Sequence, residues 1–258
     1  MTISGAARTL AALAAAATVV TGAPAQAGQI HAARTLSPSA GAPTVGACST
    51  MTAKQSNARS DRSTVVPCSQ GHTAKVAGVV RLPDRLDYSD LVKLYRVMQG
   101  RCRPKANAML GRTYAVRDSS AYDVAWFVPT KSQRENGARW ISCSIVLRQA
   151  FRLARLPTDK TPLLPSGRLG DGIHRCLLAD TSRVVTTRCQ ARHGWRATGS
   201  FVIASKRYPG YKAVSRKGKD RCASMVQKGK AYRYTWSDKI AWQAGGDHAV
   251  ICFSKTSS

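Results

Sequence analysis

The sequence predicts an α+β fold of two tandem, small, disulfide-bridged modules, each an antiparallel sheet with one packed helix. The eight cysteines fall into two quartets of similar layout, and a Cys-x3-His segment at Cys68 recurs at Cys189, with its histidine and a following glycine also shifted by 121 positions. The quartets are Cys48, Cys68, Cys102 and Cys143, then Cys176, Cys189, Cys222 and Cys252. Self-similarity at one spacing predicts a structural unit used twice.

The first module is expected to begin with strands at 63–68 and 73–80, which are rich in β-branched residues. A helix follows, because apolar residues recur at helical spacing from Leu91 toward Cys102, with Asp90 as the cap. A closing strand at 139–146 carries a tryptophan and the last cysteine of the quartet.

The second module repeats this order. Strands are expected at 183–189 and 195–202, a helix at 211–226 and a closing strand at 248–253, although Gly218 weakens the helix prediction. A small antiparallel sheet with one helix packed on it satisfies the order. The third cysteine of each quartet would then attach the helix to the last strand.

The first residues have the features of an export signal. Arg8 supplies the positive start, residues 10–20 are an apolar run too short to span a bilayer, and Ala25-Gln-Ala27 is a small-residue cleavage site. No later stretch approaches the roughly 20 apolar residues that a membrane span needs, so no transmembrane helix is expected in the mature chain. The expected divisions are a signal peptide at 1–27, a flexible linker at 28–45, modules at 46–152 and 171–258, and a linker at 153–170.

Export places the cysteines in an oxidising compartment, where an even count indicates a disulfide framework. If each module closes on itself, three pairings remain open per module. We favour pairing first with second and third with fourth, because the shorter loops close most easily. The expected bridges are Cys48–Cys68, Cys102–Cys143, Cys176–Cys189 and Cys222–Cys252.

The chain is strongly basic, with 40 Lys and Arg against 13 acidic residues and a net charge of +27. Residues 28–156 hold 20 basic and 7 acidic residues, and residues 157–258 hold 19 and 6, so the excess belongs to both modules. Such charge favours an anionic partner, either an acidic cell-wall polymer or a membrane surface, and the alternative is a contribution to solubility alone. No nucleic-acid-binding motif is present, so nucleic acid is not the expected partner.

One stretch is densest in positive charge and is our candidate for binding an anionic partner. Aromatic residues are interleaved with it, and they could stack on sugars or bases or simply form the core of the module. We favour the core. The basic residues are Lys206, Arg207, Lys212, Arg216, Lys217, Lys219, Lys228, Lys230 and Arg233, and the aromatic ones are Tyr208, Tyr211, Tyr232, Tyr234 and Trp236.

The pattern of chemical groups argues against an enzyme. Cys48 could act as a nucleophile only as a free thiolate, and the even cysteine count leaves no spare thiol. Glu135 is the only glutamate, and the cluster from Asp84 to Asp90 is better explained by turns and a helix cap than by a glycosidase acid–base pair. We therefore expect no catalytic residue.

The histidines of the repeated segment, His72 and His193, allow a metal-binding interpretation. One Cys and one His per module are too few ligands for zinc, and cysteines in disulfides do not ligate. We expect both histidines to be structural, bonded to backbone after a strand and turn, with no metal and no cofactor.

Four segments of the first module carry a recognisable pattern: Gly46-Ala-Cys48, Val66-Pro-Cys-Ser-Gln-Gly-His72, Val76-Ala-Gly-Val79 and Trp140-Ile-Ser-Cys143. Together they resemble the septum formation domain of actinobacterial exported envelope proteins. The resemblance covers most of 46–150, and the second module matches it more weakly, at His174-Arg-Cys176, Cys189 to His193, Cys222 and Cys252. It implies two tandem copies, the second divergent, in an exported or membrane-anchored protein. The family supplies no catalytic residues.

Together these features predict an extracytoplasmic, cell-wall-associated, non-catalytic protein. Its expected role is to bind an anionic wall or membrane component during cell division, with division proteins as further candidate partners. The alternative is a secreted peptidoglycan-active hydrolase that uses Cys48 or a pair of aspartates.

Overall fold

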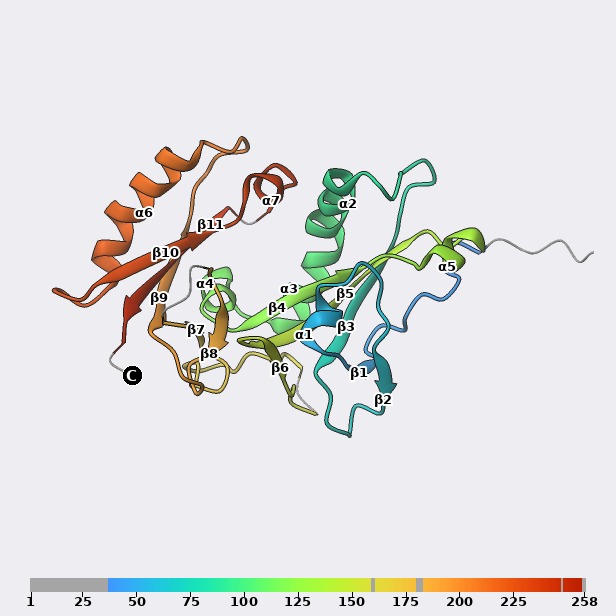
Figure 1. The fold of residues 1–258 in the computed structure, drawn as a ribbon, viewed down its shortest axis with the longest axis horizontal. Coiled ribbons are helices and arrows are strands. Elements are labelled where there is room, and N and C mark those ends of the chain that lie inside the picture. The colour runs from blue at the N-terminus through green and yellow to red at the C-terminus, as the bar shows by residue number, and fades with distance from the viewer. Residues whose placement is uncertain (1–36, 159–160, 180–182, 247, 257–258) are drawn as a thin grey trace, which may run out of the picture. The chain divides into compact units, whose positions relative to one another are not determined.

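The strands form two antiparallel sheets, one in each half of the chain (Figure 1). This computed structural model describes residues 37–158, 161–179, 183–246 and 248–256, all of which belong to one compact unit, Thr35–Ser258. The predicted signal peptide, 1–27, lies outside the described residues. Of the helices in the described ranges, none combines the length and apolar composition needed to cross a membrane.

The first sheet has six strands in the order β2-β1-β3-β5-β4, with β6 also paired to β5. Their bounds are β1 Cys48–Thr50, β2 Thr64–Val66, β3 Ala74–Arg81, β4 Tyr122–Phe127, β5 Trp140–Gln149 and β6 Arg152–Ala154. The central strand β5 is buried from Trp140 to Leu147 on both faces, which explains its nearly continuous apolar and small-residue composition. The strands expected at 63–68, 73–80 and 139–146 are β2, β3 and β5.

The second sheet has five strands in the order β10-β11-β9-β7-β8. Their bounds are β7 Arg175–Leu177, β8 Thr186–Arg188, β9 Trp195–Val202, β10 Tyr232–Trp236 and β11 Ala249–Lys255. When strands are numbered from the start of each half, both sheets have the order 2-1-3-5-4. The two sheets therefore suggest two modules of one topology.

The helical layer of the first sheet is longer than expected. Helix α2, Leu91–Val97, begins at Asp90, whose carboxylate accepts a hydrogen bond from the backbone N–H of Lys93 at 2.9 Å. It continues through a π-helical turn, η1, Met98–Cys102, into α3, Arg103–Leu110. The expected end near Cys102 is wrong, because the wide turn lets Pro104 fall in the first turn of α3, where a missing N–H is tolerated.

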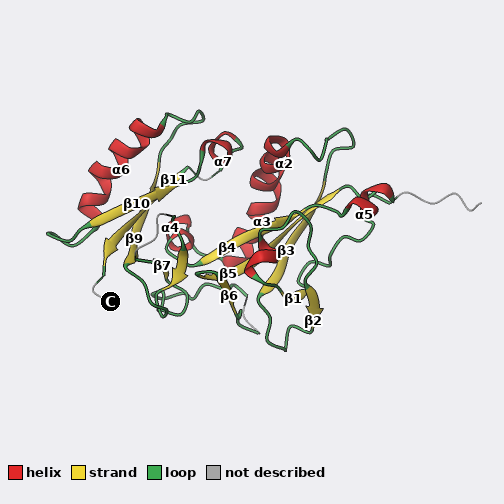
Figure 2. Cartoon of the chain, viewed as in Figure 1, coloured by secondary structure: helices red, strands yellow, loops and turns green. Residues whose placement is uncertain are grey.

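The prediction of one helix per module is too simple. The second sheet carries α6, Tyr211–Met225, close to the range expected (Figure 2). Short helices accompany the two long ones: α1 Ala53–Ser56, α4 Tyr114–Asp118, α5 Lys131–Glu135 and α7 Lys239–Gln243.

All eight cysteines are in disulfides, and the pairings are the four favoured from the sequence. They are Cys48–Cys68, Cys102–Cys143, Cys176–Cys189 and Cys222–Cys252. Cys102–Cys143 attaches η1 to β5, and Cys222–Cys252 attaches α6 to β11. Each of these two bridges lies within the apolar cluster between a sheet and its long helix.

The two segments predicted as linkers are packed where the structure describes them. Within 28–45, the backbone carbonyl of Ala40 accepts a hydrogen bond from the indole N–H of Trp140 at 3.0 Å. Within 153–170, the chain completes β6, and then Leu156, Leu163 and Leu164 are buried in the core of the first half. The composition of 28–45 suggested a flexible linker and the prolines of 153–170 suggested a linker, and buried leucines anchor this second segment in the core.

Backbone hydrogen bonds join the two halves. The N–H of Ala121 donates to the carbonyl of Ile173 at 2.8 Å, and the N–H of Arg175 donates to that of Ser119 at 2.8 Å. A third bond, at 3.0 Å, runs from the N–H of Ala150 to the carbonyl of Thr186. Helix α4 also lies against β9, and β5 against β8. The two sheets are therefore parts of one packed structure.

Candidate functional site

Helix α6 presents a basic face to solvent. Lys212, Arg216, Lys217 and Lys219 are exposed, whereas Val214, Gly218 and Cys222 recur every four residues and are buried against the sheet. Within the described part of the chain, none of the four cations forms an ion pair. Their charge is therefore available to an external anion.

The loops that flank α6 extend this basic face. Lys206 and Arg207 precede the helix, Lys228 and Lys230 follow it, and all four are exposed. We call the eight residues together the α6 basic surface: Lys206, Arg207, Lys212, Arg216, Lys217, Lys219, Lys228 and Lys230.

Arg233, the ninth basic residue predicted for this site, lies elsewhere. Side chains alternate along a strand, so Arg233 in β10 points away from its neighbours Tyr232 and Tyr234, which pack in the α6 cluster. Its guanidinium lies over the ring of Trp195, 4.8 Å from the ring centroid. Arg233 is thus on the opposite face of the second sheet and is not part of the α6 basic surface.

The interleaved aromatic residues mostly support the helix. Tyr208, Tyr232, Tyr234 and Trp236 pack against the core cluster beneath α6. The hydroxyl of Tyr232 donates to the carbonyl of Lys219 at 3.1 Å. Tyr211, at 68% exposure, is the one of the five that faces solvent. These five aromatic side chains therefore do not form a row of exposed rings on which bases could stack.

Packing and covalent attachment fix the α6 basic surface relative to the sheet. The hydroxyls of Ser215 and Tyr234 are 2.9 Å apart and share a hydrogen bond, while Cys222 is bonded to Cys252 of β11. A surface held in this way loses little conformational entropy of the backbone when it binds.

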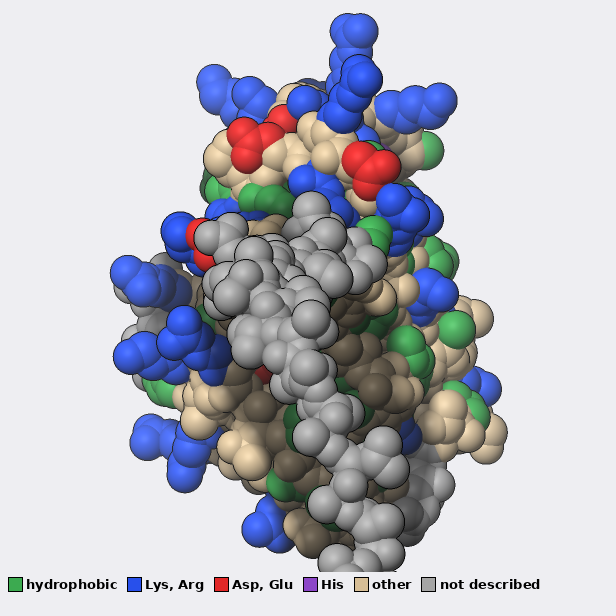
Figure 3. All heavy atoms as spheres, turned by 90° about the vertical axis from the view of Figure 1, so that its right-hand side faces the viewer, with side chains coloured by type: hydrophobic (Ala, Val, Ile, Leu, Met, Phe, Trp, Pro, Cys, Tyr) green, Lys and Arg blue, Asp and Glu red, His purple; other side chains and the backbone are tan. Residues whose placement is uncertain are grey.

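Positive charge is also present outside α6. Figure 3 shows one face of the molecule, on which Lys and Arg side chains stand around the margin and acidic side chains are sparse. The sequence likewise places an equal basic excess in the two halves. The helical segment 91–110 also carries exposed cations, at Lys93, Arg96, Arg101 and Lys105. Of these, Lys93 pairs with Asp90, whereas in the described ranges the four α6 cations form no ion pair.

The two histidines of the repeated segment make the same local contact. The Nδ1–H of His72 donates to the carbonyl of Gln70 at 2.9 Å, and that of His193 donates to the carbonyl of Ala191 at 2.8 Å. In both cases the acceptor lies two residues earlier, so the imidazole closes the turn before β3 or β9. His72 is fully buried, whereas His193 is partly exposed.

One group of side chains has the spacing of a metal site. Ligand atoms of Cys176, Cys189 and His193 lie within 4.8 Å of one another. The two sulfurs are bonded to each other, however, and a disulfide has no thiolate with which to bind zinc. With the bridge intact, this group offers a metal only one imidazole.

The candidate nucleophile Cys48 is bonded to Cys68, so the cysteine version of the hydrolase alternative lacks its thiolate. The version of the hydrolase alternative that uses a pair of carboxyl groups is not supported by the pKa shifts of the candidate acids. Hydrogen bonds from Ser89 lower the pKa of Asp87, and the backbone N–H of Lys93 lowers that of Asp90. The ammonium of Lys131 likewise lowers the pKa of Glu135, whereas a glycosidase acid needs a raised pKa.

A titratable network that the sequence did not indicate lies beside β9. His174 Nδ1 accepts a hydrogen bond from Arg196 Nη2 at 2.8 Å, and its Nε2–H donates to the carbonyl of Ala197 at 3.1 Å. Arg196 Nη1 also pairs with Asp171 at 2.7 Å. Burial, and then the charge of Arg196, hold the pKa of His174 below its ordinary value of 6.5. His174 is therefore a neutral residue with a fixed tautomer at neutral pH.

Comparison with known proteins gives one family. A family model described as "Septum formation" matches residues 46–252 in a single span that includes both sheets. No curated protein and no solved structure matches the chain.

Proposed function

The chain belongs to the septum formation family, and from this premise we propose that it is an exported, non-catalytic protein of the cell envelope that binds an anionic polymer or membrane surface during cell division. The family description suggests a role in septum formation. Four disulfides are consistent with an extracytoplasmic location. The observation that carries the binding proposal is the α6 basic surface.

The equal strand order of the two sheets supports a further part of the proposal, an origin by internal duplication. Both halves share the order of disulfide pairing and the histidine contact, although the family model spans them as one match. The duplicated halves would then have diverged, since the long helical segment of the first half contains the π-helical turn η1, whereas α6 of the second half is one uninterrupted α-helix.

Binding should depend on charge and should be sensitive to salt. The Debye length falls from about 10 Å at 0.1 M salt to about 3 Å at 1 M. We expect the oxidised mature protein to co-sediment with purified cell wall, or with vesicles that contain anionic lipid, at the lower salt concentration and to remain in solution at the higher one. Equal retention at both concentrations would exclude an electrostatic mode.

Two charge-matched variants test whether the α6 basic surface is responsible. The first carries Lys212→Gln, Arg216→Gln, Lys217→Gln and Lys219→Gln. The second carries Lys54→Gln, Arg62→Gln, Arg85→Gln and Arg96→Gln, which are exposed residues of the first half. Both lose four positive charges. We expect the first variant to lose retention several-fold and the second to keep most of it, and equal losses would show that net charge alone is responsible.

A further inference from the structure

A cavity of about 320 Å³ lies between the two halves of the molecule. Its walls come from α3, α4 and β4 on one side and from β7, β8, β10 and β11 on the other. Small-molecule sites typically have volumes of about 300–1,000 Å³ and often lie where two domains meet. Both halves are needed to enclose this cavity.

Three cationic side chains line the cavity. Arg103 of α3, Arg117 of α4 and Arg175 of β7 all line it. Two carboxylates, Asp118 and Asp123, also line it, but Asp123 is paired with Arg148 Nε at 2.9 Å. Desolvation would raise the pKa of Asp123, yet Arg148 and then Arg175 hold it below its ordinary value. The balance of charge favours an anionic ligand.

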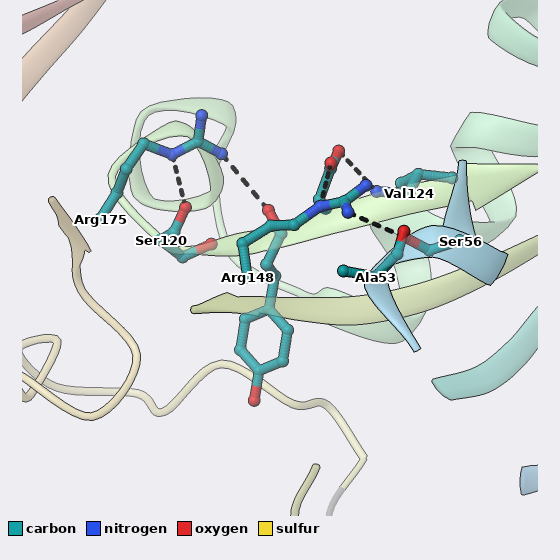
Figure 4. A network of polar contacts seen from close by, with 8 residues as sticks. Ala53, Ser56, Ser120, Val124, Arg148 and Arg175 are labelled. Atoms are coloured by element: carbon teal, nitrogen blue, oxygen red, sulfur yellow. Dashed lines mark hydrogen bonds and ion pairs between the residues drawn. The ribbon is translucent and has the colours of Figure 1, made fainter. Parts of the chain in front are cut away.

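Backbone contacts hold two of these guanidinium groups in place. Arg175 donates from Nε to the carbonyl of Ser120 at 2.7 Å and from Nη2 to that of Tyr122 at 3.3 Å, as Figure 4 shows beside the Arg148 contacts. Arg117 donates from Nη1 to the carbonyl of Gly111 at 3.2 Å. A planar guanidinium in a fixed orientation suits bidentate binding of carboxylate or phosphate at a small entropic cost.

The second half also supplies apolar residues to the cavity wall. Ala249, Ile251 and Phe253 alternate along β11 and so share the face of the second sheet that points away from α6. Leu177 of β7 adds to this face. Val184 also lines the cavity and is 60% exposed, so it stands where the cavity meets solvent.

We propose that this cavity binds a small amphiphilic anion. Its carboxylate or phosphate group contacts the guanidinium groups of Arg103 and Arg117, and its apolar body lies on the Ile251 and Phe253 face. The site uses none of the residues of the α6 basic surface and does not depend on the function proposed above.

Isothermal titration of the intact oxidised protein tests the ligand class with four soluble probes: octyl phosphate, octanoate, octyl glucoside and inorganic phosphate. We expect octyl phosphate or octanoate to bind with one-to-one stoichiometry, and the better of the two identifies the head group. Octyl glucoside and inorganic phosphate should bind at least tenfold more weakly. If either of these two controls binds as well as the anionic amphiphiles, the proposal is wrong.

Substitutions locate the binding. Val184→Glu should weaken octyl phosphate binding several-fold while Val184→Gln leaves it nearly unchanged, and exposure at this position keeps both variants folded. Arg117→Gln should weaken it at least fivefold, whereas Arg112→Gln, an exposed neighbour outside the lining, should not. Unchanged binding in both Val184→Glu and Arg117→Gln would place the ligand elsewhere and overturn the proposal.

Discussion

Glycine at position 218 is expected to be more stabilising in α6 than alanine, although alanine is the better helix former. A Cβ atom added at Gly218 would lie 2.5 Å from Cδ2 and 2.6 Å from Cε2 of Tyr234. Carbon atoms in good contact are about 3.5–4.0 Å apart, so the ring or the helix must move by about 1 Å. The ring is held in place, because its hydroxyl bonds Ser215 at 2.9 Å and its face stacks on Trp236.

Two opposing effects determine how much Gly218→Ala changes the free energy of unfolding. Replacing glycine by alanine in a helix interior stabilises by about 1 kcal/mol, and overpacking a core costs about 1–3 kcal/mol. We therefore expect Gly218→Ala to lower the free energy of unfolding by up to about 2 kcal/mol. Gly100 in η1 is the matched control, because nothing lies within 4 Å of its added Cβ. Gly100→Ala should stabilise by about 0.4–1 kcal/mol.

Urea unfolding of the oxidised protein, followed by tryptophan fluorescence, measures both variants. The two midpoints should move in opposite directions from that of the unsubstituted protein. If Gly218→Ala raises the midpoint as much as Gly100→Ala does, then Tyr234 does not occupy the space beside the helix. The packing argument for α6 would then be refuted.

Three further predictions concern the cap of α2, the Cys222–Cys252 bridge and the partly buried His174. Asp90→Ala should lower the free energy of unfolding by about 1 kcal/mol in the same urea assay, because the α2 cap is lost. Replacing Cys222 and Cys252 together by alanine should cost about 3–4 kcal/mol, as expected for a bridge with a sequence separation of 30, and a loss below about 1 kcal/mol would contradict the attachment of α6. Because the pKa of His174 is lowered in the fold, its neutral form contributes stability that is complete above pH 6.5 and declines as the pH falls from 6.5 toward the folded pKa. Urea midpoints at pH 7.5 and 5 should therefore differ less in His174→Gln than in the unsubstituted protein, and an equal difference would show that His174 does not contribute.

The sequence was most informative where a pattern is local. The strands at 73–80 and 195–202 and the helix from Tyr211 emerged close to their expected positions, because alternation and helical spacing report on burial directly. Strand β4 was not predicted. Tyr122–Phe127 is an edge strand that is buried only in part, and its pairing partner β5 comes later in the chain.

For the candidate site too, the sequence predicts local features but not contacts between distant segments. The exposed positions of Lys212 and Arg216 follow from helix periodicity, whereas the placement of Arg233 depends on which face of β10 the core covers. The arginines of the cavity could not be grouped from the sequence at all. Arg103 and Arg175 are 72 positions apart and line one cavity only because the two halves pack together.

The hydrogen bonds between the two halves bear on whether the second half is stable as a separate fragment. The face of the second sheet opposite α6 carries Leu177 and Phe253, both buried, and the first half supplies α4 against this sheet. A fragment that begins at residue 171 would expose this apolar face to water and lose its three backbone bonds to the neighbour. Such a fragment should aggregate, and the intact protein should melt in one cooperative transition.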